Sequence, residues 1–104
     1  MPRVYVVQEN PRLNYVDAER FGDVVFMTTM NYSPLKNSLV NDQIIKEIEV
    51  QMSGFDPDKD FLLLTGSPVV LGYVFHLAMT EKGYLVALQW DNMKQGYIPI
   101  TFKP

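Results

Sequence analysis

The sequence predicts a single-domain α/β protein with a mixed sheet of about five strands, two main helices and a C-terminal antiparallel hairpin. Three observations predict this class. Five short runs are rich in β-branched and aromatic residues, and two longer segments have helical patterns. Residues 60–90 have the order strand, helix, strand, as in a parallel βαβ unit. Because 104 residues can bury one core but not two, residues 1–104 are assigned to one domain.

The first two strands are predicted at residues 3–8 and 23–29. The first, RVYVVQ, is apolar on both faces, which is typical of a strand inside a sheet. Between the two strands, residues 16–21 have the pattern of a short helix that ends at Gly22. The turn-rich residues 31–39 are predicted to form a loop.

The other three strands are predicted at residues 60–65, 84–90 and 97–102. The turn DNMKQG joins the last two into an antiparallel hairpin. Pro99 has no N–H to donate to a strand ladder, which places the final strand at the edge of the sheet.

An amphipathic helix is predicted over residues 41–53, with Asn41 or Ser38 as its N-cap and Gly54 at its end. Its apolar residues recur at helical spacing and are Ile44, Ile45, Ile48 and Met52.

A second helix is predicted over residues 68–82, with Ser67 as its N-cap, Pro68 at its first position and Gly83 at its end. It is almost wholly apolar, so we expect it to be the main anchor of the core. Glycine destabilises a helix interior by about 1 kcal/mol relative to alanine. We therefore expect Gly72 to be there because it permits a close contact with the sheet.

Composition excludes several classes of function. Nine basic and twelve acidic residues give a net charge of −3, and the basic residues are scattered, which argues against nucleic-acid binding. The absence of cysteine excludes disulfides, thiolate metal sites and a cysteine nucleophile, and favours an intracellular protein. The N-terminus does not have the pattern of a signal peptide, and no segment has the roughly 20 apolar residues of a membrane helix. We expect no membrane association.

The turn TGSP, residues 65–68, has some features of an anion site. It places a glycine and the hydroxyls of Thr65 and Ser67 at the start of a helix. It lacks the lysine of a phosphate-binding loop, and Pro68 removes one N–H donor. A structural helix cap is therefore the favoured interpretation.

A candidate ligand site is predicted at the carboxyl ends of the third and fourth strands, where small α/β proteins bind ligands. It would gather Gly66, Ser67, Trp90 and Asp91, which we call the carboxyl rim. The alternative, which the usual burial of tryptophan favours, is that Trp90 closes the end of the core while Asp91 begins a turn.

Asp56, Asp58 and Asp60 alternate as in a calcium-binding loop. That loop needs glycine at its sixth position and glutamate at its twelfth, and these positions hold Phe61 and Ser67. The EF-hand is rejected, and turn chemistry explains the aspartates better. No metal site and no cofactor are predicted.

His76 is the only histidine, so a histidine metal site or a Ser-His-Asp triad has little support, and no catalytic residue is assigned. Tyr32 and Leu35 stand among polar residues in the predicted loop. They are the candidate interaction surface, together with an exposed edge of the sheet.

Four segments resemble a family of small uncharacterised proteins encoded by tailed bacteriophages. They are VYVVQEN at 4–10, FGDVVFM at 21–27, DFLLLTGSPVVLG at 60–72 and GYLVALQWDNMKQGYIPI at 83–100. The resemblance implies a phage-encoded accessory protein made in the cytoplasm of the host bacterium, and it brings no assigned activity. In that family an aspartate commonly stands at the position of Ser67, where it would cap a helix but repel a phosphate, which weakens a nucleotide-binding interpretation.

Two main hypotheses follow. The first is a non-enzymatic phage protein that acts by binding a host or phage protein, or a second copy of itself. The second is a small-ligand or nucleotide-binding module that uses the carboxyl rim. A third is a hydrolase that uses Asp91 or His76.

Overall fold

The computed structural model describes residues 1–28 and 39–104 and has the predicted α/β architecture. Within these residues, the sheet has five strands in the order β2-β1-β3-β4-β5. In chain order the elements are β1 (Arg3–Gln8), the 3-10 helix η1 (Val16–Arg20), β2 (Asp23–Thr28), α1 (Leu39–Met52), β3 (Phe61–Leu63), α2 (Pro68–Thr80), β4 (Leu85–Asp91) and β5 (Gly96–Phe102).

β1 lies inside the sheet, parallel to β2 on one side and to β3 on the other. Its apolar residues, Val4 to Val7, are fully buried, as the pattern of RVYVVQ predicts. β4 is parallel to β3, and β5 is antiparallel to β4 and forms the edge, so the βαβ order and the C-terminal hairpin are confirmed.

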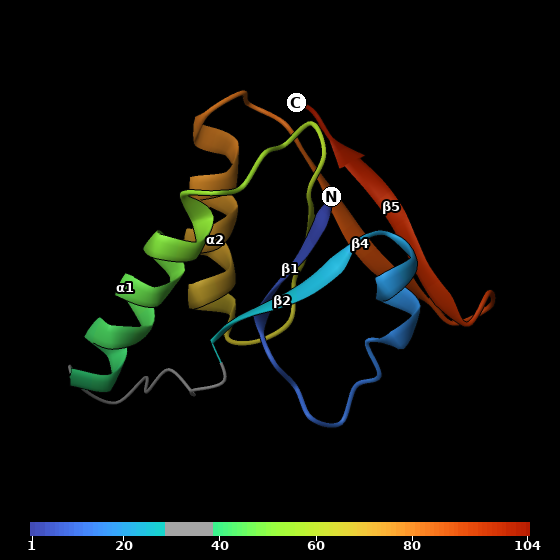
Figure 1. Ribbon diagram of the computed structural model, residues 1–104, viewed down its shortest axis with the longest axis horizontal. Coiled ribbons are helices and arrows are strands. Elements are labelled where there is room, and N and C mark those ends of the chain that lie inside the picture. The colour runs from blue at the N-terminus through green and yellow to red at the C-terminus, as the bar shows by residue number, and fades with distance from the viewer. Residues whose placement is uncertain (29–38) are drawn as a thin grey trace.

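The two faces of the sheet are covered differently. α1 and α2 lie side by side over one face, while η1 packs against the other (Figure 1). Alternation along β1 sends Tyr5 and Val7 to the helices, and Val4 and Val6 to the opposite core. The helix-side core also includes Ile44, Ile48, Met52, Phe55, Leu62, Val70, Val74, Ala78 and Leu85. The opposite core joins Ala18 of η1 to Leu63, Leu88 and Tyr97.

Several predicted element ends are wrong, and α2 ends at Thr80 rather than at residue 82. α1 begins at Leu39, so Asn41 is a buried residue inside the helix rather than its N-cap; Ser38 lies outside the described residues. β3 has three residues instead of six. β3 ends early because residues 64–65 no longer pair with β4. Thr65 still accepts a backbone hydrogen bond from Gln8 of β1 at 3.1 Å.

α2 is less buried than its composition predicts. Only Val70, Val74 and Ala78 are buried, and its other apolar residues are partly or largely exposed. The expected close contact at Gly72 is also wrong, because a Cβ built there would meet no atom within 4 Å.

Replacing Gly72 with alanine is therefore expected to raise the free energy of unfolding by about 1 kcal/mol, since alanine loses less backbone entropy in a helix. Urea unfolding followed by circular dichroism measures this change. A lower stability of the Gly72→Ala protein would contradict the absence of a close contact at position 72.

Candidate functional site

The turn between β3 and α2 is closed by the protein itself. Gly66 has a φ of +127°, and Ser67 is the N-cap of α2 but makes no side-chain capping hydrogen bond. The Ser67 N–H instead donates to Oε1 of Gln8 at 3.1 Å, and the Thr65 hydroxyl donates to the Gln8 carbonyl at 2.6 Å. Gln8 thus takes a donor that an anion would need, which supports the structural interpretation of TGSP.

A groove of about 690 Å³ lies close to this turn, where β3 ends and β4 continues beside β5. We call it the hairpin groove. It is bounded by the end of β3, the β4–β5 hairpin, Phe75 of α2 and the loop at residues 12–14. The described residues that line it are Arg12, Leu13, Asn14, Leu63, Leu64, Thr65, Phe75, Ala87, Leu88, Gln89, Trp90, Tyr97, Ile100 and Phe102.

Two aromatic pairs stiffen the walls of the hairpin groove. Trp90 and Tyr97 are cross-strand partners whose rings meet edge to face, with centroids 5.1 Å apart. Phe75 of α2 meets Phe102 of β5 in the same way at 5.2 Å. Each such pair adds about 1 kcal/mol beyond the burial of its surface. The Trp90–Tyr97 pair therefore stiffens the hairpin where it extends past β3, and the Phe75–Phe102 pair ties the other end of β5 to α2.

The loop wall is organised by Asn10. Its side-chain oxygen accepts the Arg12 N–H at 3.0 Å, and its carbonyl accepts the Leu13 N–H at 2.9 Å. The Asn10 N–H donates to the Tyr15 hydroxyl at 2.8 Å, and the Tyr15 ring packs edge-on against Phe26 at 5.2 Å. These contacts give the loop a defined shape beside the groove.

The hairpin groove is mostly apolar and carries one charge. Burial raises the pKa of the Tyr97 hydroxyl above its ordinary value, so Tyr97 is neutral at physiological pH. Among the described residues that line the groove, Arg12 is the only charged one.

Of the four residues of the predicted carboxyl rim, only Trp90 lines the hairpin groove. Trp90 lines the hairpin groove and is 39% exposed, so it does not fill the end of the core. Asp91 holds the hairpin turn, where its Oδ1 accepts the N–H groups of Met93 at 2.9 Å and Lys94 at 3.4 Å. Gly66 and Ser67 form the turn that Gln8 closes, and neither is among the lining residues.

The other sequence candidates are His76, Tyr32 and Leu35. His76 is exposed on α2 and is not among the residues that line the groove. Tyr32 and Leu35 lie outside the described residues. The loop at residues 12–14 carried no sequence signal, because it is short, polar and without period.

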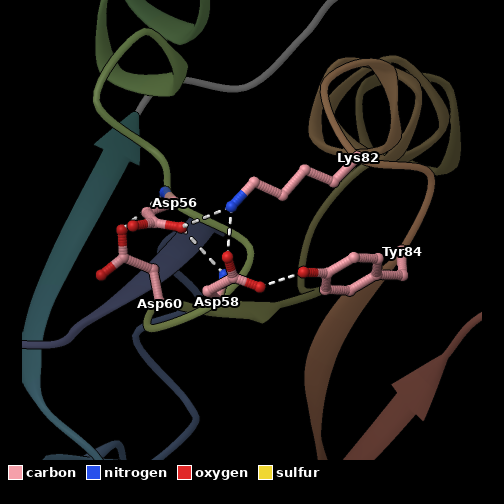
Figure 2. A network of polar contacts seen from close by, with 5 residues as sticks. All are labelled: Asp56, Asp58, Asp60, Lys82 and Tyr84. Carbon is pink, nitrogen blue, oxygen red and sulfur yellow. Dashed lines mark hydrogen bonds and ion pairs between the residues drawn. The ribbon is translucent and has the colours of Figure 1, made fainter.

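The three alternating aspartates each bind groups of the protein (Figure 2). Asp60 is 2% exposed and accepts the N–H groups of Arg3 at 3.0 Å and Asp56 at 2.8 Å. Asp58 accepts from the Lys82 ammonium and the Tyr84 hydroxyl. Within residues 1–28 and 39–104, no group of three or more His, Cys, Asp or Glu side chains is placed to hold a metal ion.

The hydrogen bond from Lys82 is the main reason that the pKa of Asp58 lies below its ordinary value, with a second contribution from Tyr84. The Lys82 ammonium and the Tyr84 hydroxyl bind the ionised Asp58 carboxylate. These two contacts join the turn after α1 to the segment that follows α2. The side chains of Asp58 and Lys82 are both solvent-accessible. Their contacts connect two parts of the fold, so the role of this network is structural.

The outer edge of β5 is covered at one point by η1. Asp17 Oδ2 accepts the Tyr97 N–H at 2.6 Å, and Arg20 donates to the Tyr97 carbonyl at 2.5 Å. Two residues further along the same edge, Pro99 offers no N–H. This edge is therefore poorly suited to pairing with a strand of a second copy.

The pH dependence of stability tests the contact between η1 and β5. The Tyr97 N–H lowers the pKa of Asp17 below its ordinary value of 3.8, with help from Arg20. Because the folded pKa is the lower one, this stabilisation is complete above the unfolded pKa and is lost as the pH falls through the folded pKa. We expect the stability advantage of the wild type over Asp17→Asn to shrink in urea titrations as the pH falls to the ordinary aspartate pKa of 3.8 and below it. A difference in stability between the two proteins that does not change with pH would contradict the role given to Asp17.

A comparison with protein families identifies the chain. The family described as "Phage Pam3 gp32-like protein" matches residues 2–104, so the chain belongs to this family, which agrees with the resemblance to phage proteins. No curated protein and no solved structure matches it. Among the helices of the described residues, none has the length and apolarity required to cross a bilayer.

Proposed function

We propose that this phage-family protein is a non-enzymatic binding module that holds a small apolar ligand in the hairpin groove. The observation that carries the proposal is the groove itself, about 690 Å³ in volume and lined mainly by aliphatic and aromatic side chains. Small-molecule sites are typically apolar hollows of roughly 300–1,000 Å³ with a few polar groups. The groove also lies at the carboxyl end of β3, beside an edge where α/β proteins commonly bind ligands.

The lining favours an apolar ligand over a nucleotide. The nearest helix N-terminus is that of α2, and its Ser67 N–H is already bonded to Gln8. A nucleotide would need several donors for its phosphates, whereas the groove offers aromatic faces and aliphatic side chains. Of the two ligand classes that the sequence left open, the structure therefore supports the small apolar molecule.

Trp90 provides a direct test because it is the only tryptophan and lines the groove. Titration with decan-1-ol, a neutral ten-carbon probe, is expected to shift Trp90 emission to shorter wavelength and to raise the melting temperature. Ile100 is half-exposed in the groove wall, so Ile100→Asp is expected to weaken this binding about tenfold while the protein still folds.

Val69→Asp is the matched control, because Val69 is exposed on α2 and does not line the groove. It should bind decan-1-ol like the wild type. No binding by the wild type, or equal losses in the two variants, would contradict the proposal.

A second candidate function is binding of a host or phage protein, or of a second copy. The observation that favours it is the exposure of large apolar side chains near the hairpin turn, where Met93 is 95% exposed and Trp90 39%. Exposed apolar clusters mark protein interfaces. With no cysteine in the chain and a phage family, we propose the host cytoplasm as the place of action.

Capture from the lysate of phage-infected bacteria tests this candidate. A specific partner should be retained by tagged wild-type protein and by Val69→Asp, but lost from a Met93→Asp variant. Equal capture by all three proteins would contradict an interface on the hairpin.

A further inference from the structure

We infer that the ligand of the hairpin groove is a small amphipathic carboxylic acid, with its apolar body against the hairpin and its carboxylate on Arg12. The inference deepens the proposed function and rests on it. It comes from the loop at residues 12–14, where Arg12 and Asn14 bring hydrogen-bond donors to the lining of the groove.

Arg12 is the first of these donors. Its backbone is fixed by Asn10, but its guanidinium makes no ion pair or hydrogen bond with any residue that the structure describes. No carboxylate stands among the described residues that line the groove. Among the described residues, the guanidinium is therefore a positive charge without a partner beside an apolar surface.

Asn14 is the second donor. Its Oδ1 accepts the Val16 N–H at 2.9 Å, which fixes the orientation of the amide. Its NH₂ group makes no hydrogen bond with the described part of the chain and is left as a donor on the loop that carries Arg12. A guanidinium and an amide NH₂ on one short loop can both donate to one carboxylate.

The remaining walls select the rest of the ligand. The hairpin side presents the paired rings of Trp90 and Tyr97, and the helix side presents Phe75 and Phe102. These surfaces suit an alkyl chain or an aromatic ring system, while the loop suits one negative charge. A saturated or aromatic acid of about ten carbons joins these two properties in one molecule.

The test compares decanoate with decan-1-ol, which have the same chain length and differ in the head group. Trp90 emission and melting temperature report binding, with decanoate kept below its micellar concentration. The wild type is expected to bind decanoate about tenfold more tightly, as a charge-assisted hydrogen bond at a partly exposed site allows. Decylammonium, the cationic counterpart, should bind more weakly than the alcohol.

Arg12→Gln should lose the preference for decanoate and keep its affinity for decan-1-ol, and Arg12→Lys should keep part of the preference. Lys94→Gln is the matched control, because it removes one positive charge from the hairpin turn at a residue that does not line the groove. It should retain the tenfold preference.

The outcomes separate the two proposals. Equal affinity of the wild type for decanoate and decan-1-ol overturns the carboxylate inference and leaves the apolar groove in place. A preference that survives in Arg12→Gln, or disappears equally in Lys94→Gln, also overturns it. If the wild type binds none of the three probes, both proposals are overturned.

Discussion

Replacing Asp60 with alanine is expected to lower the free energy of unfolding by about 3 kcal/mol. The Asp60 carboxylate is buried, and its two oxygens accept the N–H of Arg3 at the start of β1 and the N–H of Asp56 in the preceding turn. Alanine would leave both donors without this partner in a part-buried place. Each such loss destabilises a protein by about 1–3 kcal/mol.

The experiment is urea unfolding of Asp60→Ala beside Asp58→Ala, which removes the exposed carboxylate that contacts Lys82 and Tyr84 (Figure 2). Exposed ion pairs contribute little to stability, so Asp58→Ala should stay close to the wild type. Asp60→Asn should lie between Asp60→Ala and the wild type, because it keeps one acceptor. Equal losses for the two alanine variants would refute the role given to Asp60.

The sequence was sufficient to predict the class and order of the elements. RVYVVQ is apolar on both faces and becomes the interior strand β1, and Pro99 marks the edge strand β5. Ser67 and Pro68 mark the start of α2. Each prediction rests on a local rule that tertiary contacts do not override: strand burial, the missing proline N–H and the preferences of a helix start.

Predictions that depended on packing between distant segments were wrong. Asn41 is a good N-cap residue by type, yet α1 begins two residues earlier and buries it. Gly72 suggested a close contact, but whether a helix face meets the sheet or open space depends on how the helix is rotated in the fold. Residue type alone does not specify that rotation.

The candidate site was only partly visible in the sequence. The order of the strands predicts Trp90 at the carboxyl end of β4, and Trp90 lines the groove there. Arg12 was not found, because a polar loop after β1 has no period and its nearness to the hairpin arises only on folding. The same holds for Gln8, whose side chain closes a turn 59 residues further along the chain.

The turn that Gln8 closes gives the second large prediction. Gly66→Ala is expected to lower the free energy of unfolding by about 3 kcal/mol for two reasons. A φ of +127° is strained for a residue with a side chain, by about 1–3 kcal/mol. The new Cβ would also lie 2.6 Å from the Cβ of Gln8, so Gln8 would have to move and its bond to the Ser67 N–H would weaken by about 1 kcal/mol.

A double-mutant cycle with Gln8→Ala isolates the part of this loss that depends on the Gln8 side chain beyond its Cβ. The shorter side chain at position 8 removes the Oε1 and Cδ atoms that crowd Gly66, so Gly66→Ala should destabilise the Gln8→Ala protein less than the wild type. The remaining loss combines the backbone strain with the contact to the Cβ that alanine keeps at position 8. Gly72→Ala, six residues away in open space, should change stability in the opposite direction. Strictly additive losses in the cycle would contradict a role for the Oε1 and Cδ atoms of Gln8 in requiring the glycine.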